Sequence, residues 1–168
     1  MAMLYEDIRP KIRAGDLIAF SNESWGSKAD FQSQLVRIFT RSEYSHVGVA
    51  WPIGGRVMLL EAVVPEIRIF PLSKLLPFYH LPVTGTAGEW TADVEEYALS
   101  RVGQKYSKLE AIKGLFGWTE AGNKRWQCAE YVLEVLRRAG LGIDCHATPT
   151  NLVREAMSLG APLNMVTR

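Results

Sequence analysis

The sequence has little of several features that mark specialised classes of protein. Of its 168 residues two are cysteine and three are histidine, and 19 Lys and Arg against 18 Asp and Glu leave a formal net charge of +1. Two cysteines do not form a disulfide framework, and a near-neutral chain without a basic stripe gives no electrostatic reason to expect a nucleic-acid partner. No apolar run approaches the roughly 18–20 residues of a membrane span. We therefore expect one domain over residues 1–168, with no transmembrane segment.

The first residues also lack the pattern of a secretory signal peptide. Residues 1–13 have no apolar stretch and carry the charged side chains Glu6, Asp7, Arg9, Lys11 and Arg13. A signal peptide needs an apolar core of about 7–15 residues, so we expect none here and place synthesis in the cytoplasm. A cell-wall target would then require another exit route, such as release by lysis, injection or packaging in a phage particle.

Turn residues divide the chain into a mixed set of short strands and helices. The apolar and β-branched runs predict strands at residues 17–20, 44–51, 56–64, 67–70 and 78–81, with a turn at 52–55. The helical spacing of apolar residues predicts helices at 31–39, 91–102, 126–139 and 151–158, the second capped by Thr91 and the last by Thr150. Because helices and strands are mixed rather than alternating, we expect an α+β fold with an antiparallel sheet.

Cys128 lies at the start of the predicted helix 126–139. A helix N-terminus presents unpaired N–H groups and the positive end of the dipole, and both favour a thiolate over a thiol. The same N–H groups would stabilise an oxyanion formed by attack of that thiolate. The alternative is a packing role, because Cys128, Val135 and Ala139 fall on one apolar stripe of the helix. The spacing alone leaves both interpretations open.

A reactive cysteine needs a base, and His46 and Glu61 lie on the two strands of the predicted hairpin. If Gly54 and Gly55 alone form the turn, Glu61 faces Gly48, and His46 is its diagonal neighbour at about 7–8 Å. A four-residue loop would place His46 directly opposite Glu61, whereas a three-residue loop would send them to opposite faces. A carboxylate on an imidazole fixes its tautomer and stabilises the imidazolium. We expect Gly48 to leave room for the pair; the alternative for Glu61 is a solvent-facing charge.

The remaining histidines and cysteine give weaker candidates. His80 has no polar partner visible in the sequence, and Cys145 and His146 are adjacent in a predicted loop, where neighbouring side chains usually point apart. A zinc site from Cys128, Cys145 and two histidines lacks the spacing of a metal motif. The chain also has no phosphate-binding glycine loop and no G-x-S-x-G elbow. We therefore predict neither a metal nor a cofactor.

Six short strings, in their order along the chain, resemble the permuted NlpC-type papain-like cysteine hydrolases, the group that contains YiiX-like bacterial proteins and lecithin:retinol acyltransferase-like enzymes. In ordinary NlpC domains the cysteine helix precedes the histidine strand, whereas in the permuted group the order is histidine, polar residue, cysteine, as here. The strings run from residue 15 to about residue 152. They are Gly15-Asp16-Leu17-Ile18, Ser45-His46-Val47-Gly48-Val49, Leu60-Glu61-Ala62, Val102-Gly103-Gln104-Lys105-Tyr106, Gln127-Cys128-Ala129-Glu130-Tyr131-Val132 and Thr148-Pro149-Thr150-Asn151-Leu152.

This resemblance implies a circularly permuted papain-like fold, with an antiparallel sheet or small barrel packed against helices and the catalytic cysteine at a helix N-terminus. It implies Cys128 as nucleophile, His46 as general base and acid, and Glu61 as the orienting group. The backbone N–H of Cys128 would contribute to the oxyanion hole, with Tyr44 and Gln127 as candidates for a second donor. The family often has serine after the cysteine; Ala129 in its place should be tolerated, because position 129 turns away from the site.

The implied activity is that of a cysteine peptidase or amidase working through an acyl-thioester, on cell-wall (peptidoglycan) or other peptides. A lipid ester or thioester hydrolase, or an acyltransferase, is the alternative within the class. The lack of a hydrophobic tail argues against a membrane-anchored retinoid acyltransferase. A catalytically silent binding or structural domain is the alternative from another class. The expected partner is a peptide or acyl substrate, and the sequence does not indicate the oligomeric state.

Overall fold

Residues 2–21, 43–85, 88–105 and 128–168 are described by the computed structural model, and they form an α+β fold built on one mixed sheet. The strands are β1 (Met3–Leu4), β2 (Leu17–Ser21), β3 (Tyr44–Ile53), β4 (Arg56–Ala62), β5 (Ile67–Pro71), β6 (Phe78–Leu81) and β7 (Asn164–Thr167). The helices are α1 (Tyr5–Ile8), α3 (Ala92–Ser100), α5 (Cys128–Arg138) and α6 (Pro149–Ser158), with short 3-10 turns at Arg9–Lys11 and Leu72–Lys74. The predicted helix 31–39 and Gln127 lie outside the described residues.

The sheet has the strand order β1-β7-β6-β2-β3-β4-β5. The pairing of β1 with β7 is parallel, and every other pairing among these strands is antiparallel. The antiparallel sheet expected from the sequence is therefore found, with a parallel strand added at one end. Because β1 and β5 end the order, the described strands form an open sheet rather than a closed barrel.

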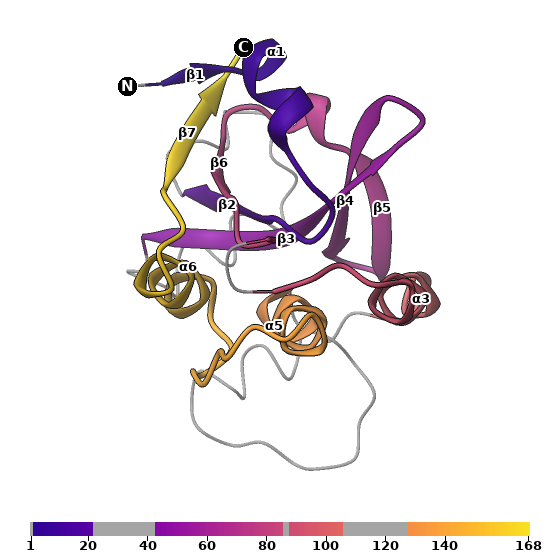
Figure 1. Ribbon diagram of the computed structural model, residues 1–168. Helices are drawn as coiled ribbons and strands as arrows, with labels where there is room; N and C mark the ends of the chain where they lie inside the picture. The colour runs from indigo at the N-terminus through magenta and orange to yellow at the C-terminus, as the bar shows by residue number, and fades with distance from the viewer. Residues whose placement is uncertain (1, 22–42, 86–87, 106–127) are drawn as a thin grey trace.

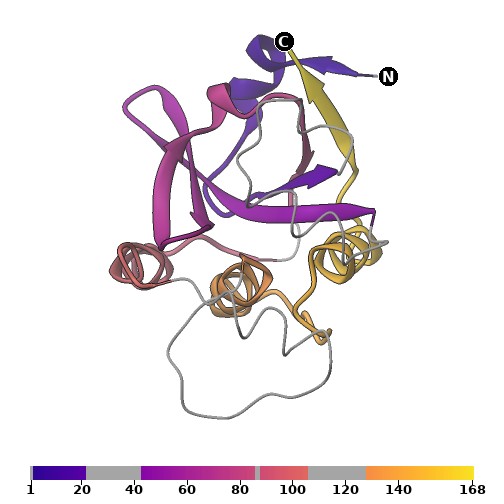
Figure 2. The same cartoon turned by 180° about the vertical axis from the view of Figure 1, so that it is seen from behind.

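Three helices cover one face of this sheet. In both ribbon views α5 lies between α3 and α6, and α1 lies at the opposite end of the molecule beside β1 and β7 (Figures 1 and 2). A helix-side cluster fills the space between the helices and the sheet, with Leu17 from β2, Val49 from β3 and Val132 from α5 all fully buried. Burial of one such Val or Leu side chain contributes about 1.5–3 kcal/mol. This packing fixes α5, and with it Cys128, against β3 and β4.

The opposite face of the strands has its own apolar core. Ile18 and Phe20 alternate with the helix-side residues of β2 and form a far-side cluster with Leu59 of β4 and Ile8 and Ile12 of the N-terminal segment. The sheet is thus buried on both faces at its centre, where β2, β3 and β4 lie side by side. A polar side chain at the buried centre of these strands is desolvated, which costs free energy unless another polar group pairs with it.

The β3–β4 hairpin turns on two glycines. Gly54 and Gly55 have φ of +56° and +75°, the left-handed values that a two-residue type I′ turn requires at both positions. The sequence predicted the turn to include Pro52 and Ile53, but both continue β3 and pair with Val57 and Arg56. β2 pairs with β3 only as far as Val49, so proline occupies an edge position here, where its missing N–H is tolerated.

The two predicted helix caps have different outcomes. Thr91 caps α3 as predicted, its side chain accepting a hydrogen bond from the backbone N–H of Val94 at 3.4 Å. The cap of α6 was predicted at Thr150 and is instead Thr148, which accepts from the N–H of Asn151 at 3.2 Å. Proline is favoured at the first helical position, so α6 begins at Pro149, earlier in the chain than the predicted start at residue 151. The Thr150 hydroxyl instead accepts a hydrogen bond from the backbone N–H of Tyr44.

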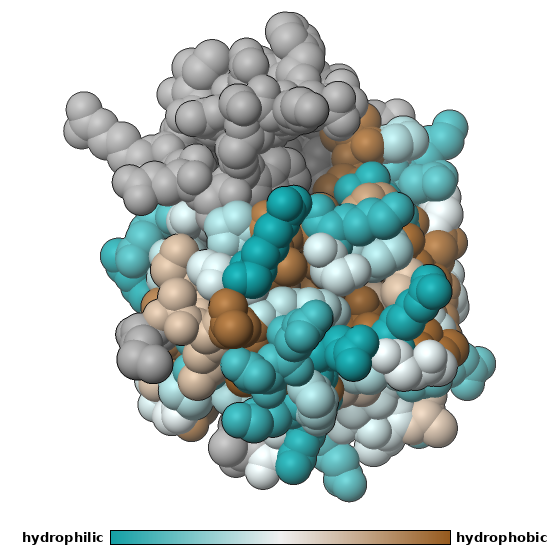
Figure 3. Space-filling model, turned by 90° about the horizontal axis from the view of Figure 1, so that it is seen from above, coloured by the Kyte–Doolittle hydropathy of each residue, from teal (hydrophilic) through white to brown (hydrophobic). Residues whose placement is uncertain are grey.

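The surface is mostly hydrophilic where it is seen from above, with apolar side chains scattered among charged and polar ones (Figure 3). Within the described ranges, none of the helices combines the length and the apolar character needed to cross a membrane.

Candidate active site

The hairpin brings His46 of β3 and Glu61 of β4 into direct contact. The register pairs Val49 with Leu60, which is the register of a two-residue turn, one of the loop lengths that the sequence left open, and it makes His46 and Glu61 diagonal neighbours. Nε2 of His46 lies 2.7 Å from Oε2 of Glu61. Both residues are buried, with exposed fractions of 8% and 0% respectively. The predicted alternative of a solvent-facing Glu61 is therefore wrong.

Gly48, next to the pair, has a different role from the one predicted. A Cβ atom built at Gly48 would lie 2.7 Å from Cδ1 of Leu59 and 3.0 Å from the carbonyl oxygen of Leu60. The space over Gly48 is thus filled by the Leu59 side chain and is not left open for His46 and Glu61. The glycine lets an apolar side chain approach β3 beside the buried pair, which helps to exclude water from it.

Cys128 is the first residue of α5, and its half-buried side chain makes a hydrogen bond with the His46 ring. Because Nε2 of His46 faces Glu61, Nδ1 is the ring nitrogen left for the cysteine. Cys128 also packs against the helix-side cluster, so the packing role considered from the sequence describes part of its surroundings.

The pKa values of the pair reflect this contact. Burial alone would lower the pKa of His46, but the hydrogen bonds and charges of Cys128 and Glu61 outweigh it and raise that pKa to about 10. Burial would raise the pKa of Glu61, but His46 and Arg68 more than offset it and lower that pKa below its usual value. The site therefore favours an ionised carboxylate next to a protonated imidazole, which is the state in which a neighbouring thiolate is stabilised.

Arg68 completes the contacts of Glu61, and no motif in the sequence singles it out. It lies directly opposite Glu61 in the pairing of β4 with β5. Its Nε and Nη2 donate to Oε1 of Glu61 at 2.9 and 2.8 Å, and its guanidinium lies 4.5 Å from the centre of the Phe70 ring. The available signal was an arginine in the strand next to an isolated buried glutamate, since opposite charges often face each other across strands.

Phe20 borders the histidine from β2. The two rings lie 5.6 Å apart at a tilt of 31°. Phe20 is fully buried in the far-side cluster and pairs with His46 across β2 and β3. This apolar wall limits the orientations that the imidazole can adopt.

Tyr44, a candidate oxyanion donor, is buried in the same helix-side cluster against which Cys128 packs. Its ring lies edge-on to Tyr79, with centroids 5.5 Å apart. Burial, followed by the charges of Glu43 and Tyr79 and a hydrogen bond with Glu43, raises the pKa of Tyr44 to about 12, so its hydroxyl keeps its proton and is a donor held by Glu43.

His80, which had no partner visible in the sequence, forms a second buried pair. Its Nε2 lies 2.8 Å from Oδ2 of Asp16, and both side chains are almost fully buried. Asp16 also accepts hydrogen bonds from the backbone N–H groups of Arg13 and Thr84. The pair therefore ties the start of β2 to β6 and the segment after it. The aspartate is separated from His80 by 64 residues, so sequence spacing could not reveal the contact.

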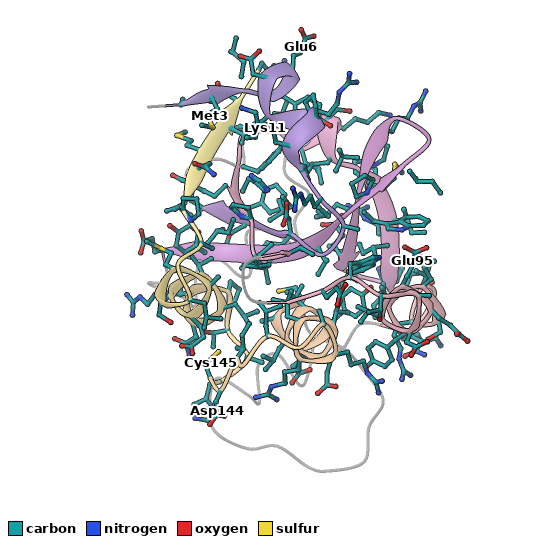
Figure 4. The ribbon with its side chains drawn as sticks, viewed as in Figure 1. Met3, Glu6, Lys11, Glu95, Asp144 and Cys145 are labelled. Carbon is teal, nitrogen blue, oxygen red and sulfur yellow. The ribbon has the colours of Figure 1, made fainter. Side chains whose placement is uncertain are left out.

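The second cysteine lies apart from the sheet. Figure 4 shows Cys145 beside Asp144 in the loop that joins α5 to α6. Burial and the charge of Glu155 raise the pKa of the Cys145 thiol, against a smaller opposite effect of Arg137. Among the residues that the structure describes, no group of three or more His, Cys, Asp or Glu side chains could hold a metal ion.

Comparison with known proteins supports the fold. No protein-family model matches the chain, and no curated protein matches it by sequence. Among solved structures it is similar to the crystal structure of metalloprotein yiiX from Escherichia coli O157:H7, DUF1105. The two share 20% sequence identity with a TM-score of 0.54, over 93% of this chain and 88% of that chain. At this identity the likeness concerns the fold alone, and it extends over nearly the whole chain.

Proposed function

We propose that this chain is a cysteine hydrolase of the permuted NlpC-type papain-like group, with Cys128 as nucleophile, His46 as general base and acid, and Glu61 as the orienting carboxylate. The observation that carries the proposal is the continuous contact from Cys128 through the His46 ring to a fully buried, ionised Glu61. A buried imidazole with a thiol on one nitrogen and a carboxylate on the other is the arrangement that general acid–base and nucleophilic catalysis require.

The first half-reaction would form an acyl-enzyme. His46 takes the proton of Cys128, and the thiolate attacks the carbonyl carbon of an amide, forming a C–S bond and an oxyanion. The backbone N–H of Cys128 donates to that oxyanion, with Tyr44 and Gln127 as candidates for a second donor. When the C–N bond breaks, the imidazolium of His46 protonates the departing amine, which leaves a neutral imidazole and a thioester.

The second half-reaction would restore the enzyme. His46 takes a proton from a water molecule as that water attacks the thioester carbonyl, and the C–S bond then breaks to release a carboxylic acid and the thiolate of Cys128. Glu61 keeps its charge throughout and stabilises the imidazolium each time it forms. We propose peptide amides, including those of cell-wall peptides, as the substrate class.

The printed name of the similar structure calls that protein a metalloprotein. Within the part of the chain that the structure describes, no group of three or more His, Cys, Asp or Glu side chains could hold a metal ion, so these described residues do not fit a metal centre.

The proposal is tested by alkylation with iodoacetamide as a function of pH, with mass spectrometry reporting Cys128 and Cys145 separately. We expect Cys128 to react at a lower pH than Cys145 and to lose this advantage in His46→Ala. His146→Ala is the matched control, because that histidine is exposed in the loop after Cys145 and should leave Cys128 unchanged. Equal reactivity of Cys128 in wild type and His46→Ala would instead favour a silent binding domain.

A further inference from the structure

Arg68 is a charged group at the proposed site that takes no part in the proton transfer. The ionisable groups at the proposed site come from four elements: His46 from β3, Glu61 from β4, Arg68 from β5 and Cys128 from α5. Arg68 contacts Oε1 of Glu61 through two nitrogens, while Oε2 of the same carboxylate faces His46. The two oxygens of Glu61 are thus divided between two partners.

The exposure of the two side chains differs sharply. The Glu61 side chain is 0% exposed, whereas the Arg68 side chain is 42% exposed and stacks on Phe70. A buried carboxylate is strongly disfavoured without a cation and hydrogen-bond donors. Arg68 supplies both from the edge strand while its own charge stays partly hydrated. The planar fork of the guanidinium also fixes the direction of the carboxylate, which a lysine ammonium cannot do.

We propose that Arg68 is a positioning residue: by holding Oε1 of Glu61 it turns Oε2 toward Nε2 of His46, so that Nε2 keeps its proton and Nδ1 is the ring atom that exchanges a proton with Cys128. This inference rests on the function proposed above. It adds a positioning residue to the set Cys128, His46 and Glu61. It also explains why a single buried glutamate can be the orienting group on an otherwise apolar strand.

The division of the two oxygens predicts an unusual result for Glu61→Gln. Arg68 donates twice and can accept nothing, so it holds the amide oxygen of the introduced glutamine and leaves the amide NH2 facing His46. Nε2 of His46 must then accept, its proton moves to Nδ1, and no lone pair remains to take the proton of Cys128. With Arg68 also replaced by methionine, the amide is free to turn its oxygen to Nε2 and restore the productive tautomer.

The test is a double-mutant cycle of Arg68→Met and Glu61→Gln, read out as the rate of Cys128 alkylation by iodoacetamide near neutral pH. In the wild-type background we expect Arg68→Met to lower the rate about tenfold, which corresponds to about 1.4 kcal/mol. In the Glu61→Gln background the same change should raise the rate. Arg68→Lys keeps the charge without the fork and should give an intermediate rate. Circular dichroism checks that each variant is folded.

Arg137→Met is the matched control, because the Arg137 side chain is also 42% exposed and its loss changes the net charge equally. Arg137 lies near Asp144 and lowers the pKa of Cys145, so this variant should slow alkylation of Cys145 and leave Cys128 unchanged. A general effect of losing one positive charge would appear in both arginine variants at Cys128.

The outcomes separate the inference from the proposed function. A reversal of sign between the two backgrounds supports the positioning role. If Arg68→Met lowers the rate equally in both backgrounds, or changes it no more than Arg137→Met does, the positioning role is refuted, while the proposed roles of Cys128, His46 and Glu61 stand. If wild-type Cys128 reacts no faster than Cys145 and is indifferent to His46→Ala, the proposed function fails first and the positioning role fails with it.

Discussion

The dependence of folding stability on pH reports directly on the buried His46–Glu61 pair. Folding raises the pKa of His46 from an ordinary 6.5 to about 10. A group whose pKa rises on folding contributes stability that is complete below the unfolded pKa and is lost as the pH rises through the folded one. We therefore expect the contribution of His46 to the free energy of unfolding to fall between pH 6.5 and about pH 10. At about 1.4 kcal/mol per pKa unit, the total loss is up to about 5 kcal/mol.

Folding changes the pKa of Glu61 in the opposite direction, so Glu61 determines the acid side of the dependence of stability on pH. Its pKa is lowered from 4.5, so its contribution is present above that pH and is lost as the pH falls through the folded value. The pair should stabilise the fold most between pH 4.5 and 6.5. This window applies to the pair and not to every ionisable group of the chain.

The assay is urea unfolding followed by circular dichroism at several pH values, for wild type and His46→Gln. Glutamine keeps a donor for Oε2 of Glu61 but does not titrate, so the difference between the two proteins isolates the histidine. We expect that difference to shrink steadily from about pH 6 to about pH 10. A difference that stays constant over this range would refute the assignment of a stabilised imidazolium to the folded protein.

Three further substitutions test separate parts of the structure. Gly48→Ala should lower the free energy of unfolding by about 1–3 kcal/mol, because its Cβ would meet Leu59 and backbone; an unchanged urea midpoint would contradict the close packing seen there. Thr148→Ala should cost about 1 kcal/mol by loss of the α6 cap, measured by thermal unfolding, and an unaltered melting temperature would argue against Thr148 as the cap. Tyr44→Phe should slow turnover of an activated ester or amide by about a hundredfold without changing Cys128 alkylation, since an oxyanion donor acts only on a carbonyl substrate; unaltered turnover would exclude Tyr44 as that donor.

Local signals were sufficient to predict the part of the site on the hairpin. The two glycines marked the hairpin turn, and a turn of either even length places His46 and Glu61 on one face; the structure has the two-residue turn. Because side chains alternate between the two faces of a strand, the residue numbers alone then place His46 and Glu61 side by side. The helix described over Cys128–Arg138 followed equally from the apolar stripe that predicts a helix over 126–139.

Contacts that depend on distant or weakly patterned segments could not be predicted in this way. The register of β4 against β5 depends on residues 63–66, which carry no turn signature comparable to the two glycines, so Arg68 was not placed opposite Glu61. The pairing of β1 with β7 joins the two ends of the described chain, and neither short strand alternates enough to be recognised. Asp16 and His80 meet only because β2 and β6 are neighbours in the sheet.

If Cys128 forms an acyl-thioester with the help of His46, that intermediate can be trapped with an activated ester. The protein is mixed with p-nitrophenyl acetate, quenched in acid and digested, and the acetylated peptides are identified by mass spectrometry. We predict rapid acetylation of Cys128, loss of the label with time as water hydrolyses the thioester, and no such labelling in His46→Ala. Acetylation of Cys145 in preference to Cys128, or equal labelling of Cys128 in the two proteins, would contradict the account.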